Sequence, residues 1–225
     1  MAIFSWFELP IYESQLDVPP KVYDGMIQYV DNYYQQNKNK ISKNNLLTGD
    51  VQGYKSNISH ENEFLWLTSI IGDHCYNYLN EIGAKTDDVD LYVQKCWPVC
   101  CESGGRVSRH FHKQSHLSVV YYLQKDNNNK SGALRFHRDI YHYLDYLPIK
   151  WGNESQFSMS YIDYHMGTNS IIVFPSNLEH EVLEYIGDDM RYSITADVMI
   201  CAKDNIEGVE FFQMGPGNWK KVPLC

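Results

Sequence analysis

The stretch HFHKQSHLSVVYYLQ, residues 110–124, joins a His-x-His pair to a run of β-branched and aromatic residues. Val and Tyr fit a pleated, half-buried surface, so the run after the histidines predicts a β-strand. Successive side chains of a strand face opposite sides, so one of Tyr121 and Tyr122 should face a core and the other a cavity. In an extended chain His110 and His112 point to the same side. The stretch therefore predicts a strand preceded by two imidazoles that could share one metal.

Short strand-like runs recur on both sides of this stretch, separated by turns rich in Gly, Asn and Asp. They are LYVQKCW (91–97), ALRFH (133–137), FSMSYIDY (157–164), SIIVFPS (170–176) and RYSITADVMI (191–200). Six or more strands at short spacing predict a sandwich, jelly roll or barrel. Earlier in the chain, apolar residues at steps of three and four predict amphipathic helices over 21–36 and 60–84. The polar segment 37–56 between them is expected to be a loop.

The order of these elements predicts one domain of the α+β class, mainly β. We expect residues 1–88 to form a helical support region, 89–200 the β-rich core and 201–225 a C-terminal extension. The length of 225 residues suits one large domain. Neither an internal repeat nor a linker divides the sequence.

Composition and charge exclude several classes of protein. The net charge of −9 disfavours a broad nucleic-acid surface, which needs clustered Lys and Arg. No stretch reaches the ~18 apolar residues of a membrane span, and the N-terminus does not read as a secretory signal. We therefore expect the six cysteines to be reduced thiols in a cytoplasmic protein.

A third histidine, His180, follows the apolar run that ends at Phe174 and a Pro turn. Together with His110 and His112 it could complete one open face of a metal site, as in non-haem Fe(II) oxygenases. Two histidines at a spacing of two are a weak signal by themselves, and a surface pair is an equal alternative.

Arg191 lies eleven residues after His180. If the two residues lie on adjacent antiparallel strands, Arg191 points into the same cavity, below the metal. A buried guanidinium can hold a carboxylate through two parallel N–H bonds. Ser193 shares its face of the strand and can add a hydroxyl. A metal above a carboxylate clamp suits a small di-acid such as 2-oxoglutarate.

These segments resemble the 2-oxoglutarate/Fe(II)-dependent dioxygenase superfamily, and most of all a compact group from marine bacteria and their phages. The similar segments are HFHKQSHLSVVYY (110–122), GALRF (132–136), FPSNLEHEV (174–182) and RYSI (191–194). Trp97 and the Gly104-Gly105 pair upstream of the histidines match as well. The likeness spans about residues 89–200, and the prolyl-hydroxylase branch shares its YYL and HEV…RYSIT patterns.

The resemblance implies a double-stranded β-helix with the helices packed outside. It also implies Fe(II) at His110 and His180, and 2-oxoglutarate held by Arg191 with help from Ser193 and Tyr122. O2 is the other co-substrate, and a need for ascorbate is left open. Most of the superfamily has Asp or Glu where this chain has His112. We favour His112 as the third metal ligand, with Asp139 and Glu102 as carboxylate alternatives.

The implied activity is hydroxylation of a protein side chain or a small metabolite, with release of succinate and CO2. Two other functions stay open: a three-His dioxygenase that does not use 2-oxoglutarate, and a non-catalytic cupin-like or virion-associated metal-binding module. If a phage encodes the protein, its location is the host cytoplasm. The aromatic segment 138–152 is either a substrate lid or an ordinary packed loop. We expect His116 at the rim of the pocket or on the surface.

Overall fold

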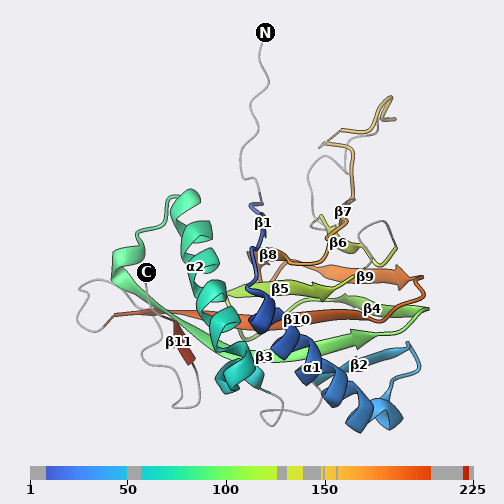
Figure 1. The fold of residues 1–225 in the computed structure, drawn as a ribbon. Helices are drawn as coiled ribbons and strands as arrows, with labels where there is room; N and C mark the ends of the chain where they lie inside the picture. Colours follow the sequence, from blue (N-terminus) through green and yellow to red (C-terminus); the bar gives the residue numbers. More distant parts are fainter. Residues whose placement is uncertain are drawn as a thin grey trace.

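A computed structural model describes residues 9–49, 57–125, 131–138, 148, 150–155, 157–203 and 220–222. Two α-helices and eleven β-strands fall within this part of the chain (Figure 1). The helices are α1 (Pro20–Asn37) and α2 (Leu65–Glu81). The strands are β1 (Tyr12–Gln15), β2 (Leu46–Thr48), β3 (Val89–Cys101), β4 (Gly105–His110), β5 (Leu117–Gln124), β6 (Leu134–His137), β7 (Tyr161–Tyr164), β8 (Ser170–Pro175), β9 (His180–Tyr185), β10 (Arg191–Ala202) and β11 (Lys220–Val222).

The strands form two antiparallel sheets. The larger sheet has seven strands in the order β1-β8-β5-β10-β3-β11, with β2 also paired to β3. The smaller sheet has four strands in the order β4-β9-β6-β7. Consecutive strands often belong to different sheets, so the chain passes back and forth between the two layers. This arrangement confirms the expected mainly β fold of the double-stranded β-helix type.

The two faces of the larger sheet have different roles, and strand β5 shows how the sequence sorts them. Val119 and Tyr121 pack into the core that the sheet shares with α1 and α2. Val120 and Tyr122 face the other way, into a smaller core with Phe136 of the opposite sheet. Both helices therefore lie outside the barrel (Figure 1). The opposite directions of Tyr121 and Tyr122 were predicted from strand alternation.

Some element boundaries differ from those predicted. Helix α2 begins at Leu65 rather than His60, because residues 58–60 and 62–64 form two 3-10 turns. The segment expected to be a loop contains β2, which pairs with β3. Strands β4 and β9 were not predicted. Most of the segment suggested as a lid, including 139–147, lies outside the described residues.

Strands from both ends of the chain complete the larger sheet. β1 pairs with β8, and β11 pairs with β3. The five cysteines in the described part of the chain are free and buried: Cys75, Cys96, Cys100, Cys101 and Cys201. Neither helix in the described ranges is both long and apolar enough to cross a membrane.

Gly105 is the first residue of β4, the strand that leads to His110, and it has no room for a side chain. A Cβ there would press on the Cys101 sulfur and lie 2.7 Å from the Glu102 carbonyl oxygen and 2.8 Å from that of Asn45. Backbone atoms cannot move aside, so Gly105→Ala should lower the free energy of unfolding by about 1–3 kcal/mol. The matched control is Gly152→Ala, because a Cβ at Gly152 meets nothing within 4 Å. Urea unfolding of both variants tests this, and equal midpoints would contradict it.

His116 is partly buried and does not sit freely at a rim, as its Nδ1 accepts a hydrogen bond from the Ile200 backbone N–H at 2.9 Å. Burial lowers the pKa of His116 from its usual 6.5. The unfolded chain therefore binds this proton more readily, so the stabilisation is present above pH 6.5 and is lost as pH falls below it. An NMR titration should place the midpoint of the His116 ring below 6.5. In His116→Asn, whose side-chain oxygen can accept the same bond without titrating, this share of the acid sensitivity should disappear.

Candidate metal centre and co-substrate pocket

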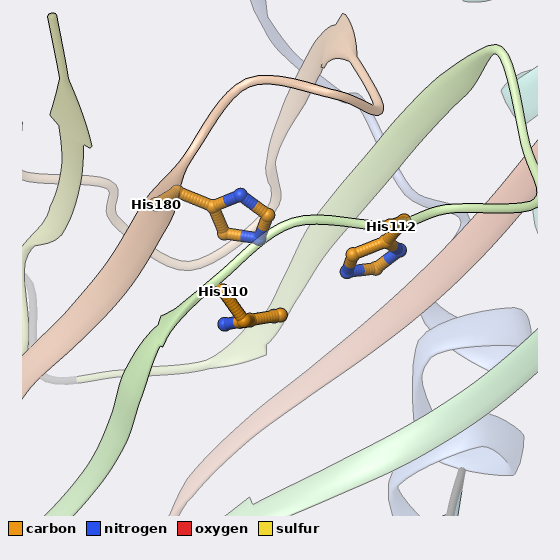
Figure 2. A group of neighbouring side chains, drawn as sticks. All are labelled: His110, His112 and His180. Carbon is orange, nitrogen blue, oxygen red and sulfur yellow. The ribbon is translucent and has the colours of Figure 1, made fainter. Parts of the chain in front are cut away.

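Three histidine side chains meet between the two sheets (Figure 2). His110 ends β4, His112 follows two residues later, and His180 begins β9 directly opposite His110 in the strand pairing. One ring nitrogen from each side chain lies within 4.8 Å of the other two. The ring centroids are 4.3 Å apart for His110 and His180, and 5.3 Å apart for each of the other pairs. The structure thus brings together the three residues predicted as metal ligands.

Two of the three rings are fixed by nearby backbone carbonyls. The Nδ1 of His110 donates to the carbonyl oxygen of Ser108, and the Nδ1 of His180 donates to that of Leu178, both at 2.8 Å. A carbonyl oxygen can only accept, so the proton of each neutral ring sits on Nδ1. The Nε2 lone pair is then the one that can bind a metal.

The third ring is fixed by a residue that sequence reasoning missed. The Nδ1 of His112 pairs with the Asp197 carboxylate of β10. The backbone N–H of His112 donates to the Ser176 carbonyl oxygen at 2.8 Å. Asp197 lies six residues after Arg191 on the same strand, and this even spacing was a signal that could have pointed to it.

The electrostatics of the site favour a neutral His180. Burial, together with the neighbouring His110 ring, lowers the pKa of His180 to about 3. An imidazole must be deprotonated to bind a metal, so a proton competes little for His180 at neutral pH.

A cavity of about 810 Å³ lies in front of the histidines, between the two sheets. Arg191, Ser193, Thr195 and Asp197 alternate along β10 and line it together with Tyr122 of β5. Residues two apart on a strand share a face, so one strand supplies both the Arg191 end of the cavity and the partner of His112.

Arg191 and Tyr122 are buried polar residues that lie against one another at the cavity. Arg191 is 2% exposed and Tyr122 is 1% exposed, and the guanidinium carbon lies 5.1 Å from the centre of the Tyr122 ring. The Arg191 Nε and the Tyr122 hydroxyl have no hydrogen-bond partner. Burial raises the pKa of Tyr122, and the charge of Arg191 offsets part of that rise. A buried cation beside an unused hydroxyl is unfavourable unless an anion binds there.

His180 and Arg191 do not lie on adjacent antiparallel strands, the arrangement under which the sequence placed both in one cavity. β9 belongs to the four-stranded sheet, whereas β10 lies in the seven-stranded sheet between β3 and β5. The chain crosses from one layer to the other between these two residues. His180 and Arg191 nevertheless line the same cavity, because each comes from a different sheet.

No carboxylate joins the group of possible metal ligands within the residues that the structure describes. Glu102 accepts a hydrogen bond from the Tyr34 hydroxyl at 2.5 Å and does not line the cavity. Asp139 lies outside the described residues.

The arrangement fits Fe(II) and a small di-acid. Three imidazoles are suitable ligands for iron and occupy only part of its coordination sphere. In the same cavity, the Arg191 guanidinium and the Tyr122 hydroxyl can hold a carboxylate by charge and hydrogen bonds. The three histidines can bind a metal, and Arg191 with Tyr122 can bind an anion in the same cavity. This arrangement matches a ligand that chelates the metal through one carboxylate and places a second carboxylate at Arg191.

Comparison with solved structures supports the fold assignment. The non-haem alpha-ketoglutarate-dependent carbocyclase SnoK of nogalamycin biosynthesis superposes with a TM-score of 0.62 at 9% identity, over 96% of this chain and 93% of that one. A Trichoplax adhaerens prolyl hydroxylase superposes with a TM-score of 0.56 at 16% identity, over 84% and 83%. A Pseudomonas putida prolyl-4-hydroxylase gives 0.53 at 15% identity, over 84% and 92%. At such identities these likenesses speak for the fold alone.

The sequence itself matches a protein family. Residues 95–197, a little under half of the chain, match the family described as "Putative 2OG-Fe(II) oxygenase". No curated protein matches the chain. The resemblance to the marine-bacterial and phage group stays a prediction. The matched segment contains every predicted site residue, from His110 to Arg191 and Ser193. Over this segment, which holds the three histidines and Arg191, the chain resembles the 2-oxoglutarate- and Fe(II)-dependent oxygenases.

Proposed function

We propose that this enzyme hydroxylates a protein side chain or a small metabolite, with release of succinate and CO2. His110, His112 and His180 are the proposed ligands of Fe(II). Arg191, with Ser193 and Tyr122, is the proposed binding site for the carboxylate of 2-oxoglutarate that lies farther from the metal. When bound, Fe(II) supplies the redox chemistry that couples decarboxylation of 2-oxoglutarate to oxidation of the substrate.

The observation that carries this proposal is the buried Arg191 that lines the histidine cavity with its Nε atom unbonded. A guanidinium that is 2% exposed is costly to bury unless an anion neutralises it. The Tyr122 hydroxyl beside it also has no partner and can donate to the same anion. A three-His enzyme without 2-oxoglutarate would have no use for this pair, so a di-acid co-substrate is favoured.

The remaining residues of the cavity orient the reactants and exclude water. The rings of Phe136 and Phe174 pack beside His180, with centroids 6.1 and 4.9 Å from its ring. Phe174 lines the cavity, with Phe136 packed against its ring, and this apolar surface strengthens electrostatic contacts inside the cavity. The Trp97 ring stacks near His112, with a centroid distance of 6.0 Å, and limits the tilt of that imidazole.

The substrate is the least determined part of the proposal. The Trichoplax adhaerens enzyme was solved with a peptide of hypoxia inducible factor, whereas SnoK belongs to nogalamycin biosynthesis, so this fold serves both peptides and small molecules. The exposed residues that line the cavity include Arg106, Phe111 and Lys113, which present positive charge and an aromatic ring.

We also propose that the chain is one catalytic domain that works in a reducing, cytoplasmic environment. Five buried free thiols support the location. Residues 1–88 and 201–225 contribute β1, β2 and β11 to the larger sheet, which supports a single folding unit.

Turnover of the co-substrate tests the proposed function. The purified protein with Fe(II), 2-oxoglutarate and O2 should release succinate slowly without substrate, and faster with the correct substrate class. Mass spectrometry of a lysate incubated under the same conditions should show a product 16 Da heavier. Metal binding without any succinate would favour the three-His alternative that does not use 2-oxoglutarate. Absence of the visible charge-transfer band of the anaerobic Fe(II) and 2-oxoglutarate complex would favour the non-catalytic alternative.

The substitution Arg191→Met should separate co-substrate binding from folding. Met has a similar length and no charge, so the affinity for 2-oxoglutarate should fall about 100-fold or more while metal affinity is kept. The ligand-free variant should be as stable as the wild type or more stable, because a buried charge with an unbonded Nε has been removed. Calorimetric titration and thermal unfolding measure the two effects.

The matched control for this experiment is Arg135→Met. Arg135 already has a partner, since its Nε and a terminal nitrogen donate to Asp163 at 2.7 and 2.8 Å, and it does not line the cavity. Its loss should leave the affinity for 2-oxoglutarate unchanged. An equal loss of affinity in both variants would contradict the role assigned to Arg191.

A further inference from the structure

Among the three proposed ligands, His112 depends most on residues from other strands for its position. His110 and His180 lie at the ends of paired strands, and each is fixed by a carbonyl two residues away. His112 lies beyond the end of β4, where no strand partner holds it. Its position depends on Ser176 through the backbone and on Asp197 through the ring.

Asp197 is itself held in place by buried hydroxyl groups. Ser118 of β5, the strand neighbour of Asp197, donates to its carboxylate at 3.4 Å. Ser118 and Ser176 share a hydrogen bond of 2.9 Å, and both are fully buried. The pairing of β10 with β3 also shifts register directly after Asp197. Such a bulge changes the direction of a side chain, which is consistent with a residue aimed at a specific target.

We infer that Asp197 is a positioning residue for His112. Together, Asp197 and His112 supply the metal site with the negative charge that a carboxylate ligand would bring. This inference rests on the proposed function. Three neutral imidazoles would leave Fe(II) with a charge of +2, one more than a site with two histidines and one carboxylate. The negative charge of Asp197, one hydrogen bond behind His112, returns the net charge of ligands and metal to +1. It also makes His112 a stronger donor, as carboxylates behind ligating histidines do elsewhere.

Metal affinity tests this role without any need for turnover. Co(II), the probe metal, should bind the wild type, and Asp197→Ala should lower its affinity about 10–100-fold. Asp197→Asn keeps an oxygen that can accept from Nδ1 but removes the charge, so its affinity should lie between the two. The control is Asp90→Asn, which removes the same charge from an ion pair with Lys221 and should leave Co(II) affinity unchanged.

Proton NMR of the Co(II) forms shows whether Asp197 acts through His112. A metal-bound imidazole that is protonated at Nδ1 gives one shifted signal that exchanges with water. The wild type and Asp197→Asn should each show three such signals. Asp197→Ala should show two, because the His112 proton loses its acceptor and exchanges quickly. Thermal unfolding of the metal-free variants identifies any loss of folding, and Asp197→Asn remains informative if Asp197→Ala does not fold.

The possible outcomes separate a failure of the role of Asp197 from a failure of the proposed function. Wild-type affinity and three signals in Asp197→Ala would overturn the role of Asp197 and leave the proposed function intact. A wild-type protein that binds no Co(II) would overturn both, and this result is read before any variant is made.

Discussion

The alternation of side chains along β10 is the constraint on which the rest of the structure depends. Tyr192, Ile194, Ala196 and Val198 face the helices and form part of the main core. Arg191, Ser193, Thr195 and Asp197 face the cavity. A strand cannot shift by one residue without exchanging these two sets, which would bury the charges against the helices. The register that secures the core is therefore the register that lines the cavity with Arg191, Ser193 and Asp197.

The sequence was sufficient for the parts of the fold that repeat a simple pattern. β5, β8 and β10 are central strands rich in Val, Ile and Tyr, and their composition alone predicted them. β4 and β9 were missed because strands such as GRVSRH lack continuous apolar residues. The three histidines could be chosen because short motifs and a family resemblance marked them.

Tertiary contacts explain what could not be read from the sequence. Asp197 and His112 are 85 residues apart, and the even spacing of Asp197 from Arg191 indicates a shared strand face but not a bond to His112. The opposition of His180 and Arg191 across two sheets depends on where the chain changes layer, which strand composition does not reveal. Residues that act alone in a motif were thus predictable, whereas residues that act through a distant partner were not.

If His110 and His180 bind the metal as proposed, their pairing links metal supply to the lifetime of the protein. β4 is an edge strand whose partner within the described part of its sheet is β9. An ion bound by His110, His180 and His112 would hold the edge strand β4 against β9. A ligand that binds only the folded chain stabilises it in proportion to its concentration. In a cell short of iron, the pairing of β4 with β9 would open more often. Proteases would then remove metal-free copies of the protein before metal-bound copies.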